Sequence, residues 1–359
     1  MWSEILINYG VFILEILTVL LVIVAIFAGI MLMRQKKDAV GGELKITDLA
    51  KQYKENQEKL RDFRLSDEQL KAEEKARKKQ EKAEAKARKK ALKEGENDQS
   101  GQKAAEDLKP CLYVLNFKGD IQASGTAALA DEISAVLAVA KAQDEVLLKL
   151  ESPGGVVHGY GLAASQLDRL KQKGVKLTVA VDKVAASGGY MMACVADKII
   201  SAPFAVIGSV GVVAQIPNIH RLLKKHDVDV EVMTAGEFKR TMTILGENTE
   251  KGRQKFQQEL EETHKLFKDF VSVHRPTLDL AKIATGEHWF GQQALELGLV
   301  DEIATSDDVI LNALNGKKDV LEVKFIQKKS LMQKIGKQAE ESGDNLLMRW
   351  LQRSNRTLY

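Results

Sequence analysis

The arrangement of apolar and polar positions divides most of the chain into three stretches. Residues 11–33 are almost continuously apolar, and residues 51–94 are dominated by Lys, Arg, Glu and Ala. From residue 110 onward, short apolar runs alternate with longer segments in which apolar residues recur at helical spacing. These three patterns predict a membrane segment, a linker and a folded domain, in that order.

The first stretch, residues 11–33, predicts a transmembrane helix. At about 1.5 Å per residue it is long enough to cross a hydrocarbon core of roughly 30 Å. Its one charged residue is Glu15. A cleaved signal peptide is the alternative, but the apolar stretch is too long, no basic segment precedes it and no small-residue cleavage site follows. We therefore assign residues 1–37 to a membrane anchor.

The charges beside this anchor predict which side of the membrane the rest of the chain occupies. Arg34, Lys36 and Lys37 follow the apolar stretch, whereas only Glu4 and the terminal amine precede it. Positive charge is retained on the cytoplasmic side of a membrane. The flanking charge therefore favours a cytoplasmic location for the domain.

The second stretch, residues 51–94, predicts either a solvated single helix or a disordered spacer. Its few large apolar residues cannot build a core, although pairs such as Glu74 with Lys78 would support a helix. Binding to a membrane surface or to nucleic acid is the alternative, but the interleaved acidic residues favour a spacer. The overall net charge of +3 is likewise weak grounds for expecting nucleic acid as a partner. We assign residues 38–109 to a charged linker.

The pattern after residue 110 predicts an α/β domain that ends near residue 305. Alternating strands and helices imply a mostly parallel sheet with helices packed against it. The predicted strands are residues 112–117, 145–152, 176–182, 198–202 and 228–234, and the predicted helices are residues 126–142, 159–174 and 254–273.

Residues 306–359 form the predicted C-terminal extension. Within it, residues 320–329 predict an edge strand, and residues 346–353 predict an amphipathic helix that covers the domain or contacts a partner subunit or the membrane. The two cysteines, Cys111 and Cys194, have neither metal-binding nor disulfide spacing, so we expect both to be small buried hydrophobic residues.

The first segment that could take part in chemistry is ESPGG, residues 151–155, at the end of a predicted strand. Two successive glycines free the backbone to turn, so that an N–H group can face an incoming carbonyl oxygen. Such a group would stabilise an oxyanion. The alternative is an ordinary Pro-Gly turn.

The second segment is AASGGYMMA, residues 185–193, in which Ser187 begins an apolar helix. A nucleophilic serine needs an accessible hydroxyl and small neighbours that admit the substrate backbone. A helix start also favours negative charge. The alternative is a serine that only caps the helix.

The residues alone do not identify a general base for Ser187. His158, His220 and His226 are candidates, but none has an obvious carboxylate to orient it. A lysine qualifies only where burial or a neighbouring cation lowers its pKa well below the usual value of about 10.4. Lys239 is next to Arg240, and the alternative for this pair is simple solvation at the surface.

Together these segments resemble the signal peptide peptidase A family of serine peptidases, and in particular its SohB branch. The resemblance covers roughly residues 112–303 and rests on SPGG, AASGGY, IGSVGV, AGEFKR and GEHWFGQQALELGLVDEI, in that order. It implies a Clp/crotonase-like α/β fold of repeated ββα units with a mostly parallel sheet. It also implies a membrane serine endopeptidase that uses a Ser-Lys dyad and needs no metal or cofactor.

The resemblance assigns a role to each candidate residue. Ser187 would be the nucleophile, and a lysine about fifty residues later, Lys239, would be the base. Gly155 and Gly188 would supply the oxyanion N–H groups, with Gly154 shaping the turn.

Two further positions complete this assignment. Ser209, in IGSVGV, would orient the lysine amine, although a plain turn serine is the alternative. The related Clp peptidases use a histidine some twenty-five residues after the serine, where this chain has Val212, so a Ser-His-Asp triad is disfavoured.

The resemblance also implies partners and a location. Family members form rings, and in relatives with two fused copies the serine and the lysine come from different copies. Because this chain carries one copy, we hypothesise homo-oligomeric rings in which Ser187 of one protomer meets Lys239 of its neighbour. The expected location is the bacterial inner membrane, with the domain in the periplasm by resemblance and in the cytoplasm by flanking charge.

The expected substrates are peptides or proteins near the bilayer, such as signal peptides and misfolded membrane or envelope proteins. Two alternatives differ in class. The first is a catalytically inactive oligomeric scaffold at the membrane with the same fold. The second is an acyl-CoA enzyme of crotonase type, which would leave the serine and lysine without a purpose.

Overall fold

The computed structural model describes residues 42–66 and 109–327, together with isolated positions between residues 17 and 86. The chain divides into two compact units, Lys45–Lys324 and the two terminal stretches, and the elements below lie almost entirely in the first. No helix in the described part is long and apolar enough to cross a membrane. The predicted transmembrane segment lies outside the described residues except at four positions, and the predicted helix at 346–353 lies wholly outside them.

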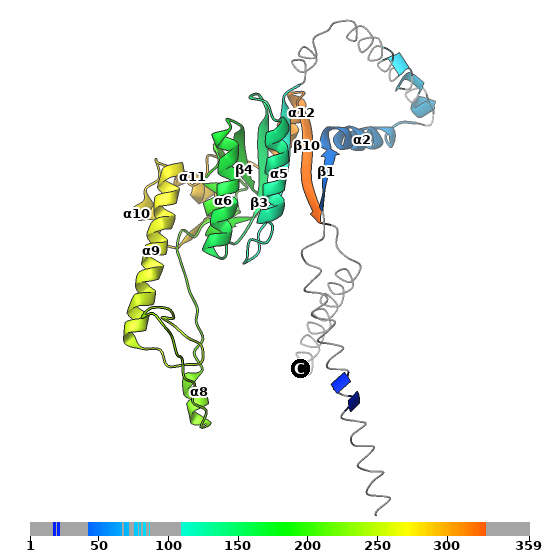
Figure 1. The fold of residues 1–359 in the computed structure, drawn as a ribbon. Helices are drawn as coiled ribbons and strands as arrows, with labels where there is room; N and C mark the ends of the chain where they lie inside the picture. Colours follow the sequence, from blue (N-terminus) through cyan, green and yellow to red (C-terminus); the bar gives the residue numbers. More distant parts are fainter. Residues whose placement is uncertain are drawn as a thin grey trace, which may run out of the picture. The chain divides into compact units, whose positions relative to one another are not determined.

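Within the described residues, the main sheet has seven strands in the order β1-β10-β2-β3-β4-β6-β9, of which Figure 1 labels β1, β10, β3 and β4. From β10 to β9, every neighbouring pair is parallel, which confirms the prediction of a mostly parallel sheet. The strands are β1 Gly42–Asp48, β2 Cys111–Lys118, β3 Glu145–Glu151, β4 Lys176–Val181, β6 Lys198–Ser201, β9 Glu302–Ile303 and β10 Asp319–Gln327.

A second, three-stranded sheet contains β5 Val184–Ala186, β7 Val206–Gly208 and β8 His288–Phe290. Strand β5 pairs with β7 in parallel, and β7 pairs with β8 in antiparallel orientation. Because β5 follows β4 after only two residues, this small sheet begins next to the end of a central strand of the main sheet.

The helices confirm the three predicted segments at 126–142, 159–174 and 254–273, which correspond to α5, α6 and α9. Their bounds, with those of the other helices whose residues the structure describes, are α2 Leu49–Asp62, α5 Thr126–Val139, α6 Val157–Gln172, α7 Gly188–Ala193, α8 His220–Lys225, α9 Glu250–His274, α10 Leu280–Ile283, α11 Gly291–Glu296 and α12 Ser306–Asn315. The predicted linker therefore contains a strand, β1, as well as a helix, α2.

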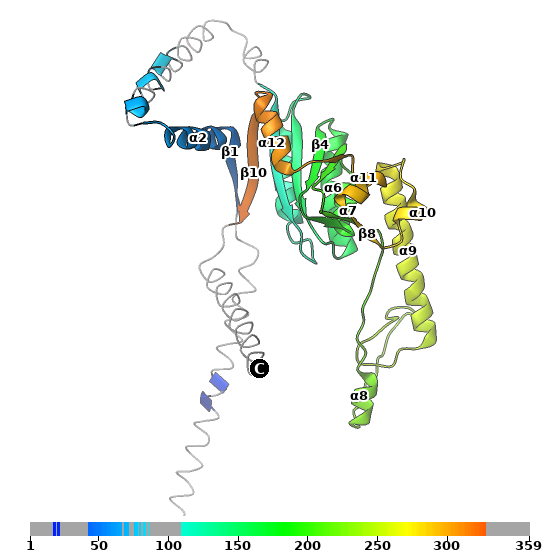
Figure 2. The same ribbon diagram turned by 180° about the vertical axis from the view of Figure 1, so that it is seen from behind.

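The central strands bury side chains on both faces of the main sheet. Leu115 and Leu148 pack in the larger cluster with residues of α5 and α6, which cover one face (Figure 1). Val114 and Leu147 pack in a second cluster with residues of α12, which covers the other face (Figure 2). Burial on both faces explains why these strands read as continuous apolar runs.

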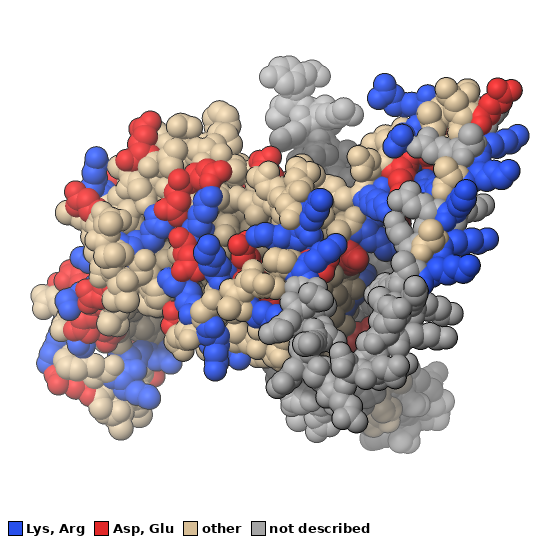
Figure 3. All heavy atoms as spheres, turned by 90° about the horizontal axis from the view of Figure 1, so that it is seen from above, with Lys and Arg blue, Asp and Glu red and all other residues tan. Residues whose placement is uncertain are grey.

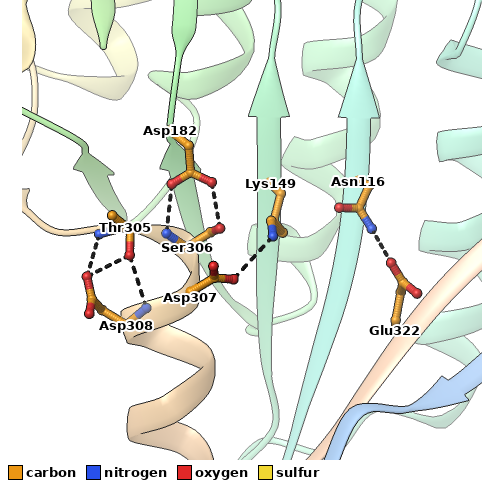
Figure 4. Close-up of polar contacts among 8 residues, drawn as sticks. All are labelled: Asn116, Lys149, Asp182, Thr305, Ser306, Asp307, Asp308 and Glu322. Atoms are coloured by element: carbon orange, nitrogen blue, oxygen red, sulfur yellow. Dashed lines mark hydrogen bonds and ion pairs between the residues drawn. The ribbon is translucent and has the colours of Figure 1, made fainter. Parts of the chain in front are cut away.

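Polar contacts fix α12 to the sheet beyond residue 305, where the sequence predicted the domain to end (Figure 4). Asp182, after β4, accepts hydrogen bonds from the backbone N–H (2.8 Å) and hydroxyl (2.6 Å) of Ser306. Lys149 of β3 pairs with Asp307 at 3.6 Å. The strand predicted at 320–329 is present as β10, but it is not the predicted edge strand, because β2 pairs with one side of it in parallel and β1 lies on its other side.

The predicted strand at 228–234 is wrong. Residues 211–249 instead form an extended arm that carries α8 and lies away from the sheets (Figures 1 and 2). Val228 and Val232 are each 46% exposed, and no strand of the described residues pairs with this segment. Alternating valines and acidic residues have the period of a strand, but a strand needs a neighbour to satisfy its backbone N–H and C=O groups.

Both cysteines are free and buried, as predicted. Burial raises the pKa of the Cys111 thiol to about 11 and that of Cys194 to about 12. Neither thiol is ionised at neutral pH, so both behave as small apolar side chains.

On the face of the sheet-and-helix body seen in Figure 3, acidic and basic side chains are intermixed. Glu151, for example, pairs with both Lys118 (3.2 Å) and Lys183 (3.0 Å). Such exposed pairs contribute little to stability, typically below about 1 kcal/mol each.

Candidate active site

The small sheet places two serines side by side. In the parallel pair of β5 and β7, Ala186 is opposite Gly208, and each is followed by a serine, Ser187 or Ser209. The backbone N–H of Ser187 donates to the Gly208 carbonyl at 2.8 Å. The β5–β7 register thus brings together Ser187 and Ser209, two of the residues predicted from sequence.

Ser187 occupies a backbone conformation that residues other than glycine rarely adopt. Its φ is 51° and its ψ is −117°, at the junction between β5 and α7. Such conformations cost roughly 1–3 kcal/mol and persist at sites where the geometry itself is used. Ser187 also makes no side-chain capping hydrogen bond to α7, so the alternative of a capping serine has no support.

The SPGG loop docks directly against this junction. Ser152 donates its N–H to Val184 and accepts at its carbonyl from the N–H of Ala186, at 2.8 and 3.0 Å. A Cβ atom added to Gly154, whose φ is +91°, would lie 2.8 Å from the Ser187 Cβ and 2.9 Å from the Gly188 nitrogen. Only a glycine allows the loop to approach Ser187 this closely.

Two backbone N–H groups beside Ser187 have no hydrogen-bond acceptor among the described residues. They belong to Gly155 and Gly188, whereas the N–H of Gly154 donates to Ser152 Oγ at 3.1 Å. Gly188 is the first residue of α7, where backbone N–H groups have no partner within the helix. The arrangement has the donors that an oxyanion hole requires, and Gly154 serves the turn.

A pocket of about 840 Å³ adjoins these groups. Ser187, Ser209 and all three predicted glycines line it, as do apolar side chains including Ile121, Val156, Met191, Val212, Val213 and Phe267. Among the described residues, no group of three or more His, Cys, Asp or Glu side chains is arranged to hold a metal ion. The pocket is therefore suited to a peptide with an apolar side chain.

Lys239 does not line this pocket within one chain. It lies on the 211–249 arm and is exposed to solvent, with its N–H donating to the Gly236 carbonyl at 3.2 Å. The candidate histidines His158, His220 and His226 do not line the pocket either. The structure of a single chain thus brings together the predicted nucleophile and the predicted glycines but not the predicted base.

Sequence reasoning missed one histidine that does line the pocket. His264, on α9, has its Nε2 atom 3.3 Å from the carbonyl oxygen of Val210, next to Ser209. The signal was its spacing: His264, Phe267 and Val271 lie on one face of α9, and the latter two are buried.

Comparison with known families and proteins gives consistent matches. The family model described as Peptidase family S49 N-terminal matches residues 4–167, and the model described as Peptidase family S49 matches residues 169–320. Together they include both glycine loops, Ser187 and Lys239.

Individual proteins match over 60% to 99% of this chain. The protein named Probable protease SohB from Haemophilus influenzae is 67% identical over 356 residues, which cover 99% of each chain. The protein of the same name from Buchnera aphidicola subsp. Schlechtendalia chinensis is 48% identical over 309 residues, covering 86% of this chain and 99% of that one. A solved structure of a mutant 1510-N membrane-bound stomatin-specific protease has a TM-score of 0.38 at 14% identity, covering 60% of this chain and 97% of that one.

Proposed function

This chain belongs to peptidase family S49 as a SohB-type member, and from that premise we propose that it is a membrane-anchored serine endopeptidase with a Ser187–Lys239 dyad. The observation that carries the proposal is the strained Ser187 at the edge of an apolar pocket, beside two backbone N–H groups that have no acceptor among the described residues. A serine held this way has the surroundings of a nucleophile in acyl transfer.

The proposed mechanism has two stages. Neutral Lys239 removes the proton of Ser187 as the hydroxyl oxygen attacks the peptide carbonyl, and the N–H groups of Gly155 and Gly188 stabilise the oxyanion. Lys239 then protonates the leaving amine and becomes neutral again. Its amine next activates a water molecule, which hydrolyses the acyl-enzyme. Ser209 orients the amine by a hydrogen bond.

We further propose that the base comes from a neighbouring chain. The arm that carries Lys239 exposes many apolar side chains, among them Met233 at 85% and Leu222 at 55%. Apolar side chains this exposed are typical of surfaces that another protein covers. A ring of identical chains would cover the arm and deliver Lys239 to the Ser187 pocket of the adjacent protomer.

The proposed substrates follow from the pocket and from the anchor predicted at residues 11–33. The aliphatic lining favours small or apolar side chains next to the cleaved bond. A ring tethered to the bacterial inner membrane would receive signal peptides or misfolded membrane and envelope proteins. A reporter fused to the C-terminus, active in only one compartment, distinguishes a periplasmic from a cytoplasmic domain.

Labelling with a fluorescent fluorophosphonate, alongside peptide hydrolysis, tests the proposal. The wild-type protein should react at Ser187, whereas Ser187→Ala should lose labelling and about 10⁶-fold in kcat. Lys239→Ala should keep its fold but lose most of its labelling and most of its peptide hydrolysis. The rate of hydrolysis by the wild type should rise with pH, because the base acts as a neutral amine.

Equal hydrolysis by the wild type and Ser187→Ala would overturn the proposed nucleophile. A folded, assembled wild-type protein that neither labels nor cleaves any peptide would support the alternative of an inactive scaffold. A rate that stays flat from about pH 6 to 9 while chemistry limits turnover would exclude a lysine base.

A further inference from the structure

A fully buried tyrosine lies beneath the site, and neither the proposed mechanism nor the sequence motifs use it. Tyr160, on α6, is 0% exposed, and its hydroxyl donates to the carbonyl oxygen of Asp120 at 2.8 Å. The hydroxyl of Ser152, also 0% exposed, donates to the Tyr160 oxygen at 2.6 Å. The Gly154 N–H in turn donates to Ser152 Oγ at 3.1 Å, so one continuous hydrogen-bond chain connects the SPGG turn to Asp120.

The direction of this chain is fixed by chemistry. The Asp120 carbonyl can only accept and the Gly154 N–H can only donate, so each hydroxyl between them must accept from one neighbour and donate to the next. Burial raises the pKa of the Tyr160 phenol, which therefore keeps its proton at neutral pH. The Gly154 N–H is consequently held toward Ser152, and the next N–H in the turn, that of Gly155, is left without an acceptor among the described residues.

The same tyrosine also limits the position of the second oxyanion donor. A Cβ atom added to Gly188 would lie 2.4 Å from Cγ of the Tyr160 ring, so the ring is in direct contact with the backbone of Gly188. Its hydroxyl end is equally enclosed, because a Cβ atom on Gly119 would lie 2.3 Å from the Tyr160 oxygen. The ring thus supports one donor, and the hydroxyl, through Ser152, supports the loop that carries the other.

We propose that Tyr160 and Ser152 are positioning residues that set the distance between the two oxyanion donors, Gly155 and Gly188. This inference rests on the proposed function, because the donors matter only if Ser187 forms a tetrahedral intermediate. It predicts that loss of the hydroxyl chain slows catalysis with little effect on substrate binding, since the donors act on the oxyanion rather than on the bound peptide.

Three single variants of the full-length protein, and one double variant, test this proposal. Tyr160→Phe and Ser152→Ala each remove one hydroxyl from the hydrogen-bond chain. Tyr160→Phe keeps the aromatic ring, which still supports Gly188. Tyr190→Phe is the matched control, because Tyr190 is also 0% exposed and donates one buried hydrogen bond, to Leu299 at 3.0 Å, that does not involve the turn. Thermal unfolding in detergent identifies which variants are folded.

We expect kcat to fall about 10-fold in both chain variants, less than the 10²-fold or more that follows removal of an oxyanion donor, with KM within about twofold. The double variant should lose about as much as either single variant, because the two hydroxyls act as one chain. Tyr190→Phe should keep its kcat within about twofold. Equal losses in Tyr190→Phe and Tyr160→Phe, or unchanged kcat in Tyr160→Phe, would overturn the proposal.

Amide hydrogen exchange gives a readout that does not depend on hydrolysis. Peptides covering residues 152–159 should exchange faster in Tyr160→Phe and Ser152→Ala than in the wild type or Tyr190→Phe. If exchange is faster in the two variants but the wild type cleaves no peptide, the proposed function is wrong and the hydrogen-bond network is confirmed. Unchanged exchange in this region, in a protein that hydrolyses peptides, would overturn the network alone.

Discussion

Ser187 and Gly154 both have positive φ angles, but for different reasons. Gly154 needs +91° so that the turn can approach Ser187, and a glycine adopts this conformation without strain. Ser187 has a side chain and is strained at 51°, which is typical of residues whose geometry serves a reaction. At the scale of single residues, the site therefore depends on backbone conformation as much as on side-chain chemistry.

Gly154→Ala should reduce kcat by about 10²-fold or more, because the added Cβ would displace the loop that carries the proposed oxyanion donor Gly155. That atom would lie 2.7 Å from the Ala186 carbonyl oxygen in a conformation unfavourable for alanine. Gly161→Ala is the control. Gly161 lies within α6 with nothing within 4 Å of its added Cβ, so this variant should retain activity and gain about 0.5–1 kcal/mol of stability.

Peptide hydrolysis and denaturant unfolding of both glycine variants give the comparison. Similar activity in Gly154→Ala and Gly161→Ala would show that the SPGG turn tolerates displacement, and that Gly155 is not an oxyanion donor.

At the scale of elements, the end of α9 is joined to the start of β9 by an ion pair. Arg275, which follows α9, donates two hydrogen bonds to Asp301 (2.9 and 2.7 Å) and one to the Gly298 carbonyl (2.8 Å). Asp301 also accepts from the Ile199 N–H at 2.7 Å, so it connects α9 to β6 as well. These contacts hold α9, which lines the pocket through His264 and Phe267, against the sheet.

The pKa of Asp301 gives this connection a pH dependence. Burial disfavours the charged carboxylate, but the hydrogen bonds from Arg275 and Ile199 outweigh burial and lower its pKa in the folded protein. Its contribution to stability is then present above its unfolded pKa of about 3.9, and is lost as the pH falls through the lower folded pKa.

Asp301→Asn should accordingly reduce the free energy of unfolding at pH 7 by about 1.5–3 kcal/mol, as expected for hydrogen bonds to a charged group. The difference from wild type should shrink below about pH 4. Glu302→Gln is the control, because Glu302 pairs with Lys198 at an exposed position, and should change the free energy by less than about 1 kcal/mol. Denaturant unfolding from pH 2 to 7 measures both, and a difference independent of pH would contradict the account.

At the scale of the whole molecule, the proposed catalytic residues lie on two different parts of the chain. The compact body carries Ser187 and the two glycine loops, whereas Lys239 lies on an arm where, of residues 211–249, only Gly246 is buried. An arm with so little burial gains little stability from its own chain. We expect it to be ordered mainly by contacts with a neighbouring protomer, as the proposed site shared between two chains requires.

The sequence predicted the mostly parallel sheet and its covering helices, because the strands are apolar on both faces and apolar residues recur at helical spacing in the helices. It predicted Ser187, Ser209 and the glycines as site residues from recognisable motifs, and the β5–β7 register places the two serines side by side. It failed at 228–234, where the strand period of alternating valines had no neighbouring strand to pair with. It also missed Tyr160, because a buried tyrosine on a helix has no local signature until the hydrogen-bond partners from distant segments are known.

Mixing two inactive proteins tests the central claim most directly. Ser187→Ala retains the base and Lys239→Ala retains the nucleophile, so rings that contain both should form complete sites wherever the two variants are neighbours in the correct order. Random mixing of equal amounts predicts recovery of about a quarter of the wild-type rate per chain, while each variant alone stays inactive. No recovery in rings shown by subunit exchange to contain both variants would contradict catalysis by Ser187 and Lys239 from adjacent chains.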